Sequence, residues 1–474
     1  MKLSTINEPE LEFGNGRHVC PRAGINKHQV YDVRMSIRRE KLLIGAVGSS
    51  EGLSKLGTWI NRCASPIPTR PDVSQPNLYP SFCGFNREVG FCAEFVHDSS
   101  ITRDLRNRDI DQVINIQQWN HRVDAAVDLF YRQIKFLVQN RSVDVIVCVI
   151  PDRLYDVIAK QGVISKDDFD DEENPDDWQE TDFRRALKAR TMHLGKPTQL
   201  VREVSLEASP KGKSNDSVRA WDICTALYYK TNRTVPWRLV TNVNRPPVCF
   251  VGVGFYRSRD RKVLHTSLAQ IFDELGNNVI LRGTPVEIDK GDRKPHLSEG
   301  QSYELLTRAL SEYEIAMGTL PGRLVLHKTS NYSKGEINGF QAAAEDGRVG
   351  ITDLVTILNT NARLLRQGSY PPYRGTHLEL DRETHVLYTR GSVDYYRTYP
   401  GKYIPHPLEV RIVASEESPQ TICEEIIGLT KMNWNNTQFD GRLPITIVCA
   451  RKVGEILKYL PADEKPQINY GFYM

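Results

Sequence analysis

The stretch NVNRPPVCFVGVGFY, residues 242–256, decides how this chain of 474 residues is organised. Its two adjacent prolines end the preceding pattern, and the apolar run after them predicts a buried strand at 248–256. Chains of this length usually form two or three domains of roughly 100 to 200 residues each. We therefore expect one domain over residues 1–244 and a second over residues 245–474.

Apolar, β-branched runs alternate with helical patterns on both sides of this boundary, which is typical of α/β architecture with buried strands. In the first half, strands are predicted at 41–48 and 143–151, and helices at 119–139, 180–193 and 217–231. In the second half, further strands are predicted near 277–282, 322–328, 351–358, 384–389 and 408–414. Helices are predicted there at about 301–316, 333–344 and 418–431, and a last strand followed by a helix at 445–460. The first half therefore resembles a doubly wound, Rossmann-like domain.

The composition excludes several classes of protein. Hydrophobic residues make up 40% and charged residues 26% of the chain, which is ordinary for a soluble globular protein, and no segment matches the roughly 20 apolar residues of a membrane span. The start, MKLSTINEPE, lacks the basic and apolar regions of a secretory signal, so we expect a cytoplasmic protein with no membrane partner. The nine cysteines form no C-x-x-C pair, which argues against structural zinc and disulfides.

The net charge of +3 conceals an uneven distribution of charge. Residues 166–182 contain ten acids and one lysine, a net −9, which leaves +12 on the rest of the chain. We interpret the acidic run as a solvated surface loop, because its spacing does not match a calcium-binding loop. The positive surplus elsewhere suits a polyanionic partner such as a nucleic acid.

Four polar side chains in the first half form a candidate anion site. Arg184 and Lys188 are four residues apart on a predicted helix and so project from one face. Gln199 begins the strand that follows, and Lys230 lies near the end of a later helix. A guanidinium, two ammonium groups and an amide donor suit a terminal phosphate. The spacing alone favours a solvated helix face, with Lys230 merely complementing a helix C-terminus, over a phosphate site.

The order of these residues resembles the 5′-phosphate pocket of the MID domains of Argonaute proteins. R-x-x-x-K is followed by glutamine in KPTQLV and by lysine in WDICTALYYK before PWRL. The segments TRGSVDYYRTYPGKYIPHPLEV (389–410) and LTKMNWNNTQFDGRLPITI (429–447), and EPELEFGNG near the start, resemble short prokaryotic Argonautes. The resemblance covers nearly the whole chain. It implies an α/β chain with a Rossmann-like MID domain followed by a ribonuclease H-like PIWI domain.

In the PIWI family, carboxylates on neighbouring strands hold two metal ions that cut the target. The first carboxylate would lie at Gly254 and the second at Thr329, and the closing segment LPITIVCARKVG has no histidine or aspartate for the last. The resemblance therefore implies a PIWI domain without nuclease activity, so we do not expect the chain itself to be an enzyme. Acids elsewhere, such as Glu287, Asp289 and Glu336, leave an atypical metal site as an alternative.

The resemblance implies that a guide RNA, anchored by its 5′ phosphate, recognises complementary target DNA without cleavage by this chain. It further implies a heterodimer with an APAZ-domain effector, such as a NAD-hydrolysing sirtuin-like or TIR protein, in antiviral prokaryotic immunity by abortive infection. Mg²⁺ beside the guide phosphate, held in part by the terminal carboxylate of Met474, is also implied. The alternatives are a guide-directed endonuclease and an unguided ribonuclease H-like scaffold.

Tyrosines and arginines are concentrated in one segment of the second half. They are Tyr388, Arg390, Tyr395, Tyr396, Arg397 and Tyr399. Such side chains could supply stacking faces and phosphate contacts for a nucleic acid. They could equally form a core and turn segment around Pro400 and Gly401.

Overall fold

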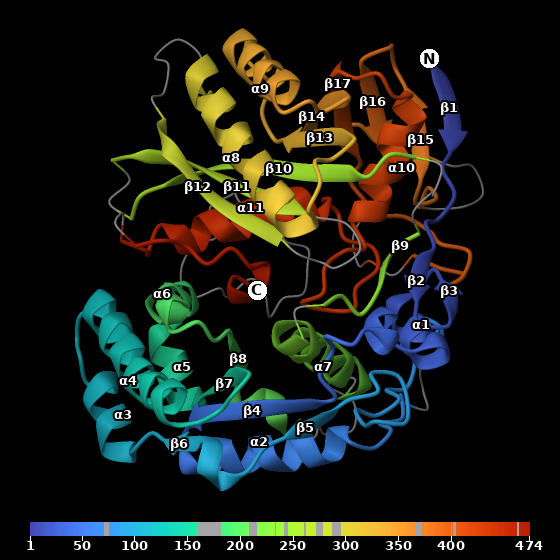
Figure 1. Cartoon of the computed structure of the whole chain (residues 1–474). Helices are drawn as coiled ribbons and strands as arrows, with labels where there is room; N and C mark the ends of the chain where they lie inside the picture. Colours follow the sequence, from blue (N-terminus) through green and yellow to red (C-terminus); the bar gives the residue numbers. More distant parts are fainter. Residues whose placement is uncertain are drawn as a thin grey trace.

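The computed structural model of the chain is shown in Figure 1. It describes residues 1–70, 75–159, 182–207, 216–232, 234–240, 245–259, 262–271, 278–286, 295–365, 371–399, 401, 404–461 and 464–474. Two expectations fall outside these ranges: the acidic run, of which only Asp182 is described, and the acids Glu287 and Asp289. Among the described residues, no helix has both the length and the apolar character needed to cross a bilayer.

The first half is built on a parallel sheet of five strands. Its order is β5–β4–β7–β8, with β6 pairing to β4 as well. The strands are β4 (Lys41–Gly48), β5 (Glu94–Val96), β6 (Thr102–Asp104), β7 (Val145–Ile150) and β8 (Thr198–Arg202). The side chains of β7 alternate between two cores, Val145, Val147 and Val149 on one face and Ile146, Cys148 and Ile150 on the other. Both faces are therefore covered, which confirms the doubly wound prediction.

Helices pack on both faces of this sheet. They are α2 (Ser50–Cys63), α3 (Asn107–Ile114), α4 (Trp119–Asn140), α5 (Asp152–Ile158), α6 (Asp182–Thr191) and α7 (Asp216–Asn232). α2 and α7 contribute to the core on one face, and α3, α4, α5 and α6 to the core on the other. The helices predicted at 119–139, 180–193 and 217–231 are confirmed.

The second half is built on a mixed sheet of nine strands in the order β1–β15–β16–β17–β14–β13–β10–β11–β12. The interior strand β10 (Val248–Arg257) is antiparallel to β11 (Leu264–Ile271) and parallel to β13 (Arg323–Lys328). The other strands are β1 (Lys2–Thr5), β12 (Asn278–Val286), β14 (Ile351–Asn359), β15 (Thr376–Glu379), β16 (Thr384–Leu387) and β17 (Leu408–Ala414). The strand predicted after the two prolines is thus an interior strand of this sheet, third from its β12 edge.

Four helices cover the two faces of the large sheet (Figure 1). α8 (Glu299–Met317) and α9 (Lys334–Asp346) pack on one face of β10 and β13. α10 (Pro419–Leu429) and α11 (Ile445–Leu457) lie against the other face. This arrangement is the α/β architecture expected from the sequence.

The structure corrects two sequence predictions in the second half. The last strand expected at the start of 445–460 is wrong, because helix α11 begins directly after Pro444. Its apolar side chains Ile445, Cys449 and Val453 recur every four residues and face the core, so helical periodicity prevails over β-branched content. Strand β11 was not predicted, although it forms a hairpin with β10.

The N-terminal segment connects the two halves. β1 pairs with β15, so residues 2–5 belong to the sheet of the second half and not to that of the first. β2 (Leu11–Phe13) then pairs with β3 (Gly16–His18) and with β9 (Arg238–Leu239), ahead of α1 (Pro21–His28). The expected division at residue 244 therefore does not separate the two sheets completely.

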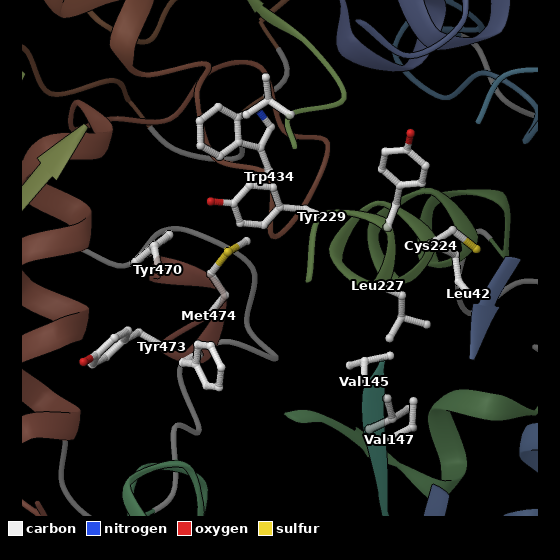
Figure 2. Close-up of a cluster of buried hydrophobic side chains, with 14 of the residues drawn as sticks. Leu42, Val145, Val147, Cys224, Leu227, Tyr229, Trp434, Tyr470, Tyr473 and Met474 are labelled. Carbon is white, nitrogen blue, oxygen red and sulfur yellow. The ribbon is translucent and has the colours of Figure 1, made fainter. Parts of the chain in front are cut away.

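One hydrophobic core runs from the first sheet into the second half. Figure 2 shows Val145 and Val147 of β7 below Leu227 of α7, with Tyr229 of the same helix beside Trp434. The rings of Tyr229 and Trp434 are stacked with centroids 5.0 Å apart. Tyr470, Tyr473 and Met474 belong to the same buried cluster. The last residues of the chain are thereby packed against the elements that carry the candidate site.

Candidate functional site

Three of the four predicted site residues meet at the start of β8. The ammonium group of Lys188 donates a hydrogen bond to the main-chain oxygen of Thr198 at 3.0 Å, and that of Lys230 donates to the same oxygen at 3.3 Å. Lys230 also donates to the side-chain oxygen of Gln199. Helices α6 and α7 therefore bring two lysines to one main-chain oxygen.

Both lysines are buried, which is unusual for this residue type. Lys188 is 2% and Lys230 3% exposed. Lysine is almost never fully buried unless it is paired, because removing an ammonium ion from water is costly. Burial lowers the pKa of Lys230 well below its ordinary value, and the nearby charges of Arg184 and Lys452 lower it further.

Arg184 completes the predicted set. It lies two turns before the end of α6 and is half-buried, and its charge acts on both Lys230 and Tyr470. No carboxylate of the described chain is among the main causes of the pKa shift of Lys230. Arg184 and Lys452 thus place positive charge near Lys230.

Lys452 was missed by the sequence analysis. It lies on α11, in the second half of the chain, and is half-buried. Its charge lowers the pKa of Lys230 and also acts on the thiol of Cys449. The ionic contact of Arg185 with Glu455 at 2.9 Å and the hydrogen bond from Tyr459 to Asp182 dock α11 on α6.

Met474 lies in the same pocket. Its main-chain oxygen accepts a hydrogen bond from Lys230 at 3.1 Å, and the residue is 1% exposed. The oxygens of Gln199 and Met474 both face the ammonium group of Lys230. Within the described ranges, no three His, Cys, Asp or Glu side chains gather where they could hold a metal ion.

Gly254 and Thr329 stand at the two positions where the resemblance places nuclease carboxylates. Gly254 lies on β10, and Thr329 directly follows β13, whose Lys328 pairs with Val253. The adjoining face of the sheet is in close contact with α11, and the ring of His327 lies 2.8 Å from the hydroxyl of Thr446. Burial and the charge of Arg323 lower the pKa of His327 to about 3, so the ring is neutral.

Glu336, considered above as a metal ligand, is fully engaged elsewhere. Its carboxylate accepts hydrogen bonds from the main-chain nitrogens of Ser333 at 2.8 Å and Leu297 at 3.0 Å. It also pairs with Lys328 at 2.5 Å. Burial raises the pKa of Glu336, but Lys328 and these hydrogen bonds outweigh that effect, and the pKa lies below its ordinary value. The residue caps α9 and closes a buried ion pair.

The tyrosine- and arginine-rich segment mostly supports the core interpretation. Tyr388 and Tyr396 are buried, and the ring of Tyr396 stacks on Phe439 with centroids 4.3 Å apart. Arg390 is also buried and donates to the main-chain oxygen of Asp440 at 3.0 Å. Arg397 is exposed. The buried members hold the turn together and are not available for stacking on bases.

Argonaute proteins are similar to this chain in sequence and in fold. No protein-family model matches the sequence. The argonaute protein of Aquifex aeolicus (strain VF5) is 24% identical over 213 residues, which cover 44% of this chain and 27% of that protein. Clostridium butyricum Argonaute superimposes over 98% of this chain and 53% of its own, with a TM-score of 0.67 and 16% identity. Drosophila Piwi superimposes over 100% of this chain and 56% of its own, with a TM-score of 0.59 and 15% identity.

The chain is a homologue of the Argonautes. Its α/β architecture, with a Rossmann-like MID domain followed by a ribonuclease H-like PIWI domain, is confirmed. The chain spans little more than half the length of the solved structures that it matches, 53% for the Clostridium and 56% for the Drosophila protein. α6, β8 and α7 lie with the first sheet, in the half expected to be the MID domain, and α11 lies on the sheet of the half expected to be the PIWI domain.

Proposed function

We propose that this Argonaute homologue is of the short prokaryotic kind and anchors the 5′ phosphate of a guide RNA between α6, β8 and α7. The observation that carries the proposal is the convergence of buried Lys188 and Lys230 on Thr198 and Gln199. A terminal phosphate offers several acceptor oxygens and a charge that matches these lysines and the guanidinium of Arg184. The main-chain oxygen of Thr198, which accepts from both lysines, is neutral, so the phosphate would be a stronger partner than this oxygen.

Structures of relatives differ in the guide that they hold. The Clostridium butyricum Argonaute is bound to a guide DNA and a 19-mer target DNA. The Marinitoga piezophila Argonaute, with a TM-score of 0.58 to this chain, is in complex with a 5′ OH guide RNA. The 5′ group is therefore the feature to test. For this chain we propose a 5′-phosphorylated guide RNA and a complementary target DNA, recognised by base pairing.

The deciding experiment compares one short RNA with either a 5′ phosphate or a 5′ hydroxyl. Its affinity is measured at fixed salt for the protein co-expressed with the product of the neighbouring gene, because phosphate contacts make affinity salt-dependent. We expect the phosphate to strengthen binding by about 10- to 100-fold, the range for hydrogen bonds to a charged group. Lys188→Ala and Gln199→Ala should lose this preference. Equal affinities for both RNAs would favour the unguided scaffold.

We further propose that the PIWI domain does not cut the target. Glycine and threonine stand where the resemblance places carboxylates, at Gly254 and Thr329, and Glu336 is engaged as a helix cap. A labelled target paired with the guide should stay intact in Mg²⁺ or Mn²⁺. Cleavage at one defined position would instead support the endonuclease alternative.

Catalysis in this proposal belongs to a partner. We infer an APAZ-domain effector, such as a NAD-hydrolysing sirtuin-like or TIR protein, that forms a heterodimer with this chain in the cytoplasm. Recognition of invading DNA would activate the effector and cause abortive infection. Co-purification with the neighbouring gene product, and NAD consumption only when guide and matching target are both present, would support this inference.

A magnesium ion is proposed only together with the guide. The oxygens of Gln199 and Met474 face Lys230, so the ion would have to take most of its ligands from the guide phosphates. Chelation should then weaken binding of the 5′-phosphorylated RNA without affecting the folding of the free protein. We retain 1–244 and 245–474 as the proposed MID and PIWI boundaries, with β1 as an N-terminal strand added to the PIWI sheet.

A further inference from the structure

Asp32 is a buried carboxylate at the end of α7, outside the phosphate pocket. It is 0% exposed and lies in the short 3-10 turn Tyr31–Arg34. The hydroxyl of Tyr228 donates to one of its oxygens at 2.7 Å, and the hydroxyl of Thr234 donates to the other. The carboxylate thus joins the last turn of α7 to the residue that follows the helix.

A negative charge in this place does not stabilise the helix. The C-terminus of a helix carries a partial negative charge of its own, so a carboxylate there is unfavourable. Burial also raises the pKa of Asp32. Arg38 compensates through the tyrosine, since its guanidinium donates to the Tyr228 hydroxyl at 2.8 Å and to the main-chain oxygen of Phe91 at 2.8 Å. Burying this carboxylate therefore costs free energy, and the hydrogen bonds around it hold the last turn of α7 in one geometry.

That geometry determines where Lys230 points. Tyr228 and Lys230 are two residues apart on a helix, about 200° around its axis, so they project from opposite faces. Tyr228 faces Asp32, whereas Lys230 faces Thr198. The main-chain nitrogen of Arg39 donates to the side chain of Asn232 at 2.7 Å and fixes the same turn from the Asp32 side.

We propose that Asp32 is a positioning residue for the guide. Through Tyr228 it holds the last turn of α7, and thereby keeps the ammonium group of Lys230 at the place where the 5′ phosphate binds. This inference rests on the proposed function, since it assigns to the segment before the MID sheet a part in reading the 5′ end. Asp32 itself contacts no nucleic acid.

The test is the ratio of the affinities for 5′-phosphorylated and 5′-hydroxyl RNA, measured well below the melting temperature. Asp32→Asn and Tyr228→Phe should each reduce this ratio about tenfold, the equivalent of one hydrogen bond to a charged group. Binding of the 5′-hydroxyl RNA should remain within about twofold, because the rest of the guide contacts are intact. Tyr228→Phe keeps the buried ring and serves if Asp32→Asn does not fold.

The matched control is Asp353→Asn. Asp353 is also 0% exposed and pairs with a buried arginine, Arg323, at 2.6 Å, but it lies in the PIWI sheet away from α7. Asp353→Asn should lower the melting temperature and leave the ratio of the two RNA affinities unchanged. A wild-type ratio in both Asp32→Asn and Tyr228→Phe would overturn the positioning role. A wild-type protein with no preference at all would overturn the proposed function, and this inference with it.

Discussion

The ammonium group of Lys230 lies 3.1 Å from the main-chain oxygen of Met474. A helix of the MID domain therefore bonds directly to a residue that packs with the PIWI domain, as Figure 2 shows for the neighbouring Tyr229 and Met474. Both Lys230 and Met474 are buried. The proposed phosphate site thus includes residues from both halves of the chain, and changes on either side of it should alter guide binding.

The first prediction concerns the contribution of the PIWI domain to this pocket. Lys452→Met should weaken binding of the 5′-phosphorylated RNA about tenfold, because one charge near the phosphate is removed. The dependence of log affinity on log salt should become shallower by about 0.7, the value for one phosphate contact on a single strand. Lys458→Met on the same helix is the control, since Lys458 pairs with Glu455 at 2.6 Å. Equal losses in both variants would contradict a specific role for Lys452.

The sequence predicted most of this pocket but not all of it. Lys188, Gln199 and Lys230 could be found because helix α6, strand β8 and helix α7 follow one another along the chain in a recognisable order. Lys452 lies in another domain, and no local pattern connects it to the MID lysines. Its approach depends on how α11 packs on α6, which is a tertiary contact that periodicity does not reveal.

The second prediction tests the close contact between α11 and β10. A Cβ atom at Gly252 would lie 2.1 Å from the main-chain oxygen of Thr446, so Gly252→Ala must displace the start of α11. We expect a loss of about 1–3 kcal/mol in the free energy of unfolding, as for other overpacked cores. Gly300→Ala is the control, because a Cβ at that helical position meets no atom within 4 Å. In a denaturant titration of both variants, Gly300→Ala should leave the free energy of unfolding unchanged or raise it slightly.

The third prediction concerns the buried charges that attach the N-terminal segment to the PIWI domain. Glu8 pairs with Arg374 at 2.9 Å and with Lys431, and both cationic side chains are 0% exposed. Glu8→Gln removes the negative charge that Arg374 and Lys431 share in the described part of this network. It should lower the free energy of unfolding by about 3–5 kcal/mol. Glu12→Gln breaks a partly exposed ion pair with Arg238 at 2.8 Å. It should lower the free energy of unfolding by under about 1 kcal/mol.

Calorimetry or urea unfolding of the two glutamate variants would compare them directly, and similar small losses would show that the Glu8 network does not hold the segment. The sequence could not predict this network. The segment KLST is short and polar, so β1 carries no strand signal of its own, and it forms only by pairing with β15. Glu8 is an ordinary charged residue until the fold buries it between Arg374 and Lys431.

The fourth prediction is a pH dependence that originates at His327, on strand β13 beside β10. The pKa of His327 is about 3 in the folded protein, because the ring is buried and close to Arg323, against an ordinary 6.5. A depressed pKa means that the stabilising neutral form is complete above pH 6.5, and that stability is lost as the pH falls from there toward 3. Between pH 7 and pH 5 the free energy of unfolding should fall by about 2 kcal/mol from this group.

His327→Gln isolates this contribution, because glutamine can keep the hydrogen bond to the Thr446 hydroxyl but does not titrate. The difference in the free energy of unfolding between wild type and variant should shrink or reverse by about 2 kcal/mol from pH 7 to pH 5. A variant with the same pH profile as the wild type would show that the pKa of His327 is the same in the folded and unfolded states, and that burial does not lower it. Below pH 6.5 the buried ring beside Gly252 and Thr446 would then carry a positive charge.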